Sequence, residues 1–245
     1  MKTNDPLLQP FTLKHLALKN RVMSTSHEPA YSEEGLPKER YQLYHEEKAK
    51  GGIGLTMFGG GTLVAPDSPA AYGNLYAGND EIVPHFRELA RRVHAHGAAT
   101  MCQLSHLGRR TSNYAGDWLP VIAPSAVREP AHRAFPKAME DWDIRRIVKA
   151  YGAAARRCRE GDLDGIEVFA NGHLLERDTT KTKASTKQKT TSDSNGEGPA
   201  AAADDAAETA TQALPTLQPQ VITTDAQLQA LVERLQQCRD RSQPV

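Results

Sequence analysis

Apolar and polar residues follow one another in blocks that predict strands and helices in turn over the first two-thirds of the chain. Short β-prone or apolar runs predict strands at 21–26, 53–58, 98–104 and 164–170. Between these runs, helix formers and apolar residues at helical spacing predict helices at 39–50, at 80–96 and from Asp141 or Asp143 to Gly161. This order is typical of a parallel sheet with helical crossovers, which a barrel and an open doubly wound sheet both satisfy.

The last third of the chain has a different pattern. Between Glu176 and Ala213 there is no Val, Ile, Leu, Met or aromatic residue, so this stretch cannot bury enough apolar surface to fold. We expect a core domain at 1–175, a disordered linker at 176–220 and a short β-α tail at 221–245. The tail is either a fraying helix after a short strand at 221–223, or the start of a truncated or fused domain.

Charge and cysteine spacing exclude several classes of protein. Thirty Lys and Arg residues balance thirty Asp and Glu residues, so no net field draws the chain to nucleic acid or to an anionic membrane. The three cysteines are far apart in sequence and predict neither a zinc nor an iron–sulfur site. There is no apolar run long enough to span a bilayer and no signal peptide, so we expect a cytoplasmic protein with no metal.

Five motifs in order resemble the Old Yellow Enzyme family, the NADH:flavin oxidoreductases. They are DPLLQPFTLKHLALKNRVMSTS, GGIGLTMFGGGT, HAHGAATMCQLSHLGR, IAPS and GDLDGIEVFANGHLL. Within the family the chain most resembles the amine-demethylating branch, near the N-methylproline, dimethylamine and trimethylamine enzymes. The resemblance implies an α/β fold, a TIM (β/α) barrel with FMN at the carboxyl ends of its strands, and NADH or NADPH as reductant or electron partner. This chain would supply strands one to four, a partial barrel.

Gln103 is the cofactor contact that the resemblance implies most specifically. It ends the third strand, where a side-chain amide can both donate and accept hydrogen bonds at the mixed edge of the flavin. The alternative is an ordinary polar residue at a strand end. Arg109, on the following loop, could favour the anionic reduced flavin, or could be a surface arginine.

Further cofactor contacts implied by the resemblance follow the first two strands. Hydroxyl and backbone groups would lie under the flavin, and glycines would let the backbone approach it, although each residue is also an ordinary turn residue. These positions are Ser24, Thr25, Ser26, His27, Gly59 and Gly60. Relatives often have Thr or Cys where His27 stands, and in some of them the Cys is attached covalently to the flavin. Because His27 has no thiol, we expect no covalent link here.

The fourth strand departs from the family pattern. Many relatives have a His-x-x-His or His-x-x-Asn pair there that polarises a substrate carbonyl, but Phe169 replaces the first histidine. Asn171 and His173 are the candidates to replace the pair in catalysis. An apolar Phe169 favours a small methylated amine, oxidised by hydride loss to the flavin, over reduction of an alkene.

The resemblance assigns the FMN phosphate loops to strands that this sequence lacks. We therefore expect the chain to be incomplete, not to retain FMN by itself, and to expose two unpaired strand edges. Two hypotheses follow: an FMN-dependent oxidoreductase acting on a small molecule, or a non-catalytic half-barrel module that pairs with another chain. The sequence does not specify an oligomeric state.

Overall fold

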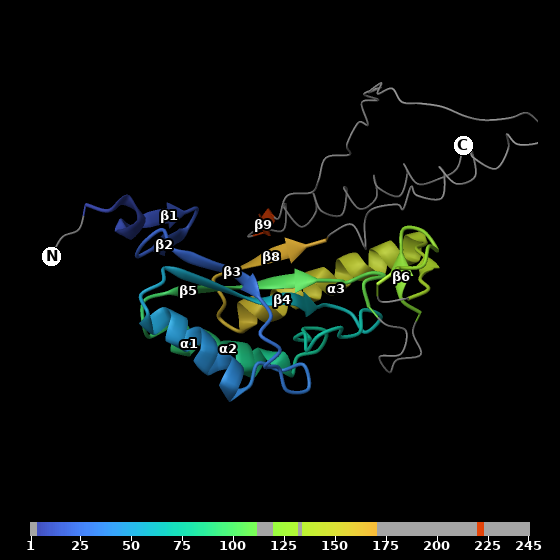
Figure 1. Ribbon diagram of the computed structural model, residues 1–245, viewed down its shortest axis with the longest axis horizontal. Coiled ribbons are helices and arrows are strands. Elements are labelled where there is room, and N and C mark those ends of the chain that lie inside the picture. Colours follow the sequence, from blue (N-terminus) through green and yellow to red (C-terminus); the bar gives the residue numbers. More distant parts are fainter. Residues whose placement is uncertain (1–3, 112–119, 132–133, 171–219, 223–245) are drawn as a thin grey trace, which may run out of the picture. The chain divides into compact units, whose positions relative to one another are not determined.

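A five-stranded sheet with helices packed against it forms the centre of the protein (Figure 1). The computed structural model describes residues 4–111, 120–131, 134–170 and 220–222. The helical elements are η1 (Pro6–Leu8), α1 (Glu39–Lys50), α2 (Ile82–His94) and α3 (Asp141–Glu160). The strands are β1 (Phe11–Leu13), β2 (Leu16–Leu18), β3 (Met23–His27), β4 (Leu55–Leu63), β5 (Ala99–Ser105), β6 (Ile122–Ala123), β7 (Lys137–Ala138), β8 (Gly165–Phe169) and β9 (Gln220–Ile222).

Four strands of this sheet run parallel in the order β3, β4, β5, β8. Phe58 on β4 lies opposite Cys102 on β5, which lies opposite Ile166 on β8. Each parallel strand therefore lies beside the parallel strand that precedes it in the sequence. A doubly wound sheet reverses its strand order at a switch point, whereas a barrel does not.

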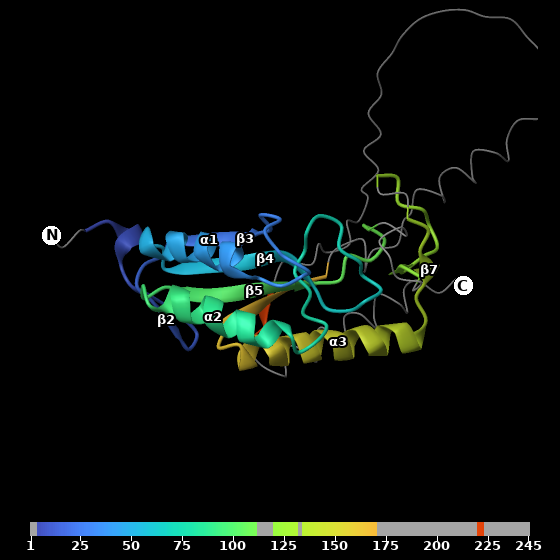
Figure 2. The same cartoon turned by 90° about the horizontal axis from the view of Figure 1, so that it is seen from below.

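The helices show which of the two architectures is present. The Phe58 ring lies 6.2 Å from the ring of Tyr41 on α1 and 5.6 Å from that of Phe86 on α2. Cys102, which lies on β5 opposite Phe58, contacts Cys158 on α3. Burial is the main cause that raises the pKa of the Cys158 thiol, and the contact with Cys102 raises it further. All three crossover helices thus cover one face of the sheet (Figure 2), and this confirms the predicted partial (β/α) barrel.

The opposite face of the sheet is the inside of the barrel. The antiparallel hairpin β1–β2 covers its amino end, where apolar side chains from the hairpin, β4 and β5 form a floor. Burial of one such side chain stabilises the fold by about 1.5–3 kcal/mol. The floor consists of Leu18, Leu55, Met57, Ala99 and Met101, with Leu13 and Leu16 packed against it.

The element bounds differ from the predicted bounds at several places. The helix predicted at 39–50 is α1 itself, whereas α2 is shorter than the predicted 80–96. β4 runs through Gly59–Gly61 to Leu63, because the register shifts between Phe58 and Thr62; the prediction that these glycines follow the strand was wrong. The hairpin β1–β2 and the pair β6–β7 were not predicted, since strands of two or three residues leave no readable alternation.

The first turn of α3 settles its predicted start. Both Asp141 and Asp143 were candidates, and the helix begins at Asp141. The Glu140 side chain accepts the backbone N–H of Asp143, while the Asp143 side chain accepts that of Glu140. This capping box satisfies two N–H groups that have no partner within the helix.

One edge of the barrel sheet has a partner. β9 pairs antiparallel with residues 166–168 of β8, so the expectation of two unpaired edges was wrong. This strand begins one residue before the predicted 221–223, and the rest of the predicted linker and tail lies outside the described residues. β3 forms the other end of the sheet. Among the described helices, none is long and apolar enough to cross a membrane.

Candidate functional site

Above the apolar floor, the inner face of the barrel carries a polar layer of three side chains from three strands. Gln103 Nε2 on β5 donates to Ser26 Oγ on β3 at 2.6 Å and to Glu167 Oε2 on β8 at 2.7 Å. Ser26 Oγ also donates to Glu167 Oε2 at 3.2 Å and closes the triangle. Gln103 is buried, although Ser26 and Glu167 are half-buried. We call these three residues the polar triangle.

The other end of the Gln103 amide is bound as well. Gly61 N–H on β4 donates to Gln103 Oε1 at 2.8 Å. Gly61 is itself held by the buried Asn74, whose Nδ2 donates to the Gly61 carbonyl at 3.1 Å. Both amide hydrogens of Gln103 therefore have acceptors within the chain. The amide oxygen has two lone pairs and uses one of them to accept the Gly61 N–H.

The other glycines of β4 are required by the packing of the chain itself. A Cβ on Gly59, whose φ is +66°, would lie 2.0 Å from Thr62 Oγ1. A Cβ on Gly60 would lie 2.9 Å from the backbone nitrogen of Glu28. Both positions need glycine whether or not a flavin approaches them, so the role predicted for Gly59 and Gly60 stays a prediction.

Glu28 and Tyr41 form a second group beside this strand. The Tyr41 hydroxyl accepts the Gly59 N–H at 3.0 Å and donates to Glu28 Oε2 at 3.4 Å. Burial raises the pKa of Glu28 to about 7, although hydrogen bonds from Ala30 N–H and Tyr41 act in the opposite direction. This carboxyl group can therefore change its protonation state near neutral pH, next to the carboxyl end of β3.

The loop after β5 is anchored by a buried ionic cluster. His106 Nε2 lies 3.2 Å from Asp67 Oδ1, and the same carboxylate accepts both ends of the Arg146 guanidinium. His106 Nδ1 accepts the Gly108 N–H at 3.1 Å, so Nε2 carries the hydrogen that faces Asp67. Burial opposes ionisation of Asp67, but hydrogen bonds from His106 and Arg146 outweigh it and hold the pKa of Asp67 well below its usual value. His106 thus supports the loop on which Arg109 lies.

Four other predicted contacts lie outside the polar triangle. Ser24 Oγ lies 3.2 Å from Thr56 Oγ1, which in turn contacts His45 on α1, so Ser24 is directed to the helix side of the sheet. Thr25 is exposed on β3, and His27 is exposed with its ring 6.4 Å from that of Tyr44 on α1. Arg109 is half-buried and donates to the Val127 carbonyl at 3.4 Å.

The structure adds Glu167, which the sequence analysis missed. Gln103 and Glu167 lie opposite each other in register on β5 and β8. The available signal was an acidic residue in the middle of the apolar run GIEVF. Phe169 follows two residues later on the same strand and is half-buried, whereas Asn171 and His173 lie outside the described residues.

The donor chemistry of this layer fits FMN. The pyrimidine edge of a flavin presents carbonyl oxygens and one N–H donor, and Gln103 keeps one acceptor position for such a donor. The layer also lies toward the carboxyl ends of parallel strands, where barrel enzymes bind their ligands. Among the described residues there is no group of three or more His, Cys, Asp and Glu side chains that could hold a metal ion.

Comparison with known proteins agrees with this geometry. Residues 6–200 match the NADH:flavin oxidoreductase / NADH oxidase family. The chain is 58% identical over 173 residues to a multifunctional alkene reductase/demethylase of Caballeronia cordobensis, covering 71% of this chain and 26% of the relative. It is 57% identical over 174 residues to a probable N-methylproline demethylase of Rhizobium meliloti strain 1021, with the same shares.

A solved structure extends the likeness to the fold. Morphinone reductase in complex with tetrahydroNAD superimposes on the chain with a TM-score of 0.65 and 25% identity, over 70% of this chain and 51% of that one. The chain thus spans about a quarter of the two sequence relatives and about half of morphinone reductase. These findings confirm the family predicted from the motifs. The chain belongs to the NADH:flavin oxidoreductase / NADH oxidase family.

Proposed function

We propose that this chain forms the Gln103 side of an FMN site in an oxidoreductase that moves a hydride through the flavin. The polar triangle is the observation that carries the proposal, since it puts a buried, oriented amide on the inner face of the barrel. Gln103 would hold the pyrimidine edge of the ring, with Ser26 and Glu167 beside it. FMN, when bound, supplies the two-electron chemistry, and the chain supplies position and electrostatics.

A small methylated amine is the proposed substrate. Two relatives are more than half identical to this chain over the matched region: one is named a multifunctional alkene reductase/demethylase and the other a probable N-methylproline demethylase, so demethylase is the term that both names share. Phe169 supports the same choice, because an apolar ring at the end of β8 can pack against a methyl group but cannot polarise a carbonyl. The proposed roles of Asn171 and His173 remain predictions.

Binding of FMN to the full 245-residue chain tests the first part of the proposal. When the chain is titrated into FMN, the quenching of FMN fluorescence should saturate. The affinity should be weak, because relatives hold the FMN phosphate on loops that follow later strands of the barrel. Gln103→Leu should weaken binding about tenfold, the effect of losing one buried hydrogen bond to the ring. Thr12→Val, on the hairpin at the opposite end of the barrel, is the matched control and should bind as the parent chain does. If the parent and Gln103→Leu bind FMN with equal affinity, the proposed FMN site at Gln103 is wrong.

The substrate is tested on the FMN-loaded chain without oxygen. N-methylproline should bleach the visible absorbance of the flavin and release formaldehyde, as expected when a methyl hydride leaves and water cleaves the resulting iminium ion. Proline, which lacks the methyl group, is the control and should leave the absorbance unchanged. Bleaching by NADH or NADPH but not by N-methylproline, followed by recovery of the absorbance when 2-cyclohexenone accepts the hydride, would instead assign the chain to alkene reduction.

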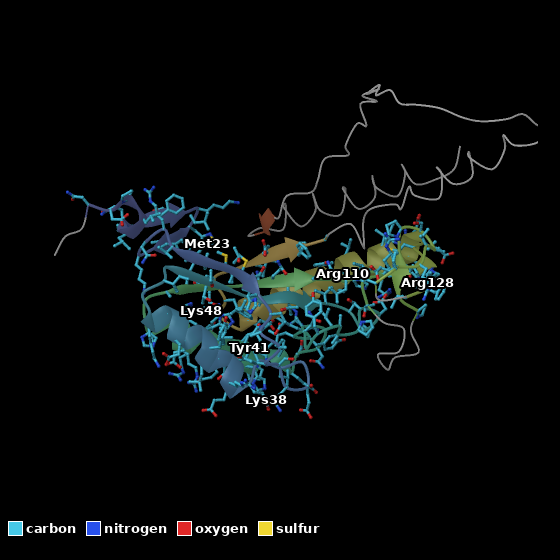
Figure 3. The ribbon with its side chains drawn as sticks, in the orientation of Figure 1. Met23, Lys38, Tyr41, Lys48, Arg110 and Arg128 are labelled. Atoms are coloured by element: carbon cyan, nitrogen blue, oxygen red, sulfur yellow. The ribbon has the colours of Figure 1, made fainter. Side chains whose placement is uncertain are left out.

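A second candidate, a half-barrel module that pairs with another chain, rests on the position of β3. This strand, on which Figure 3 labels Met23, lies at the end of the sheet. The Met23 side chain is 47% exposed. An unpaired edge beside exposed apolar side chains is a template for another strand. A colourless chain that forms a stable complex with a polypeptide carrying strands five to eight of a relative would support this candidate. A yellow chain that stays monomeric in the same mixture would contradict it.

A further inference from the structure

We infer that Glu167 is a positioning residue that fixes which end of the Gln103 amide meets FMN, so that the amide oxygen receives the N3–H of the flavin ring. The inference deepens the proposed FMN site and rests on it. The geometry consists of the three contacts of the polar triangle and the Gly61 N–H bond to Gln103 Oε1.

Two neighbours of Gln103 have a polarity that cannot change. The Glu167 carboxylate only accepts hydrogen bonds, and the Gly61 backbone N–H only donates. They contact opposite ends of the same amide. Turning the amide by half a revolution would place its oxygen against the carboxylate and its NH2 group against another N–H, and the bonds at both ends would be lost. The chain itself therefore selects one orientation.

Ser26 reinforces this selection. Its hydroxyl accepts one amide hydrogen of Gln103 and gives its own hydrogen to Glu167 Oε2. A hydroxyl group can reverse its direction, but here Glu167 fixes it, since a carboxylate offers no hydrogen to accept. Glu167 thus orients Gln103 twice, once directly and once through Ser26.

The fixed orientation decides what Gln103 offers to a flavin. Both amide hydrogens are used within the chain, so the remaining group is the second lone pair of Oε1. The pyrimidine edge of the oxidised ring has one hydrogen-bond donor, N3–H, between two carbonyl acceptors. An acceptor held in place matches that donor, whereas a freely rotating amide would also pair with either carbonyl.

The first experiment tests the orientation without FMN. The side-chain amide of Gln103, assigned by its loss in Gln103→Leu, is followed by ¹⁵N NMR in the full chain. Its two hydrogens should exchange slowly with water in the parent and at least tenfold faster in Glu167→Leu, which removes the acceptor. Glu167→Gln keeps a side-chain oxygen at the same place and should restore slow exchange. Glu160→Leu removes a carboxylate that contacts Arg156 on the surface, and it should change nothing.

The second experiment adds FMN labelled with ¹⁵N at N3. In the parent and in Glu167→Gln, the bound N3 resonance should lie downfield of free FMN, as expected for a donor with an acceptor. Glu167→Leu should lose most of this shift and bind FMN about five- to tenfold more weakly. If Glu167→Leu does not fold, Ser26→Ala provides the test, because it removes one of the two acceptors and should give an intermediate exchange rate and shift.

The two experiments separate the possible failures. Fast exchange of the Gln103 amide in the parent, or equal exchange in the parent and Glu167→Leu, overturns the positioning role even if FMN binds. A held amide in a chain that does not bind FMN overturns the proposed function and the flavin part of this inference. In a third outcome, the exchange of the Gln103 amide changes in Glu167→Leu but the N3 shift of bound FMN does not. Glu167 would then be a purely structural residue, and the inference that it positions Gln103 for the flavin would be overturned.

Discussion

The buried carboxylate of Asp67 gives a prediction that tests how the loop after β5 is held. We consider the change Asp67→Asn, which keeps the shape of the side chain but removes its charge. Asp67 is 2% exposed and accepts hydrogen bonds from His106 Nε2 at 3.2 Å and from Arg146 Nη1 at 3.0 Å. After the change, an NH2 group replaces one oxygen and faces a donor.

The size of the loss follows from burial. Removing one partner of a fully buried ion pair costs about 3–5 kcal/mol. The Arg146 side chain is 37% exposed, so water can compensate part of its lost partner, and we expect a decrease of about 2–3 kcal/mol in the free energy of unfolding. For a chain of this size, this corresponds to a melting temperature lower by about 4–12 °C.

Thermal unfolding near neutral pH, followed by circular dichroism, measures this change. Asp80→Asn is the matched control, because Asp80 also binds two arginines, Arg156 at 3.0 Å and Arg157 at 2.7 Å, but its side chain is 70% exposed. Its melting temperature should stay within error of the parent, since exposed ion pairs contribute little. Equal losses in Asp67→Asn and Asp80→Asn would refute the argument from burial.

The difference in stability between the parent and Asp67→Asn should depend on pH. The pKa of Asp67 in the folded chain is below its usual value, so the unfolded chain takes up a proton first as the pH falls. The stabilisation by Asp67 is complete above the unfolded pKa of about 4 and is lost as the pH falls toward the lower folded pKa. The difference between the parent and Asp67→Asn should therefore shrink below about pH 4. A difference that grows in acid would contradict the assigned direction of the pKa.

Two further predictions concern β4 and its neighbour. Gly59→Ala should lower the free energy of unfolding by about 1–3 kcal/mol more than Gly97→Ala does. Both glycines have φ near +65°, but a Cβ at Gly59 would clash with Thr62 Oγ1, whereas a Cβ at Gly97 would meet no atom within 4 Å. Equal losses for the two variants in urea unfolding would contradict this. The parent should lose stability as the pH rises from about 4.5 to about 7, because the pKa of Glu28 is about 7 in the folded chain and the buried carboxyl group must then ionise. Glu28→Gln cannot ionise at this position and should not show this loss. Melting temperatures at about pH 5 and about pH 8 test it, and the same slope in both proteins would count against a buried, protonated Glu28.

The elements of the barrel could be predicted because their patterns are local. The apolar stripe of α2 and the helix formers of α1 end at glycines or just before them, and the apolar runs of β5 and β8 are bounded by polar turns. Whether the sheet belongs to a barrel or to an open doubly wound fold could not be predicted in this way, because periodicity does not say on which face of the sheet a helix packs. The family motifs supplied that information.

The site was predictable in part for a similar reason. Gln103 stands in the most specific motif of the chain, and the structure brings it to Ser26, another predicted residue. Glu167 was missed because an acidic residue in a strand has the same local pattern whether it faces water or an amide. Its partner Ser26 is 141 residues away in the sequence, and only the packing of β3 beside the other strands brings the two together.

The register of the strands connects the apolar floor to the chemistry of the polar triangle. Side chains two residues apart on a strand lie on the same face, so Met101 in the floor and Gln103 in the triangle are successive positions on the inside of β5. A shift of one residue would place Cys102 inside the barrel and direct Gln103 toward α3. The floor disfavours this shift, because Thr100 and Cys102 would replace Ala99 and Met101 among its apolar side chains. The hairpin β1–β2 contributes Leu18 to the floor and packs Leu13 and Leu16 against it, so it helps to hold the register that directs Gln103 into the barrel.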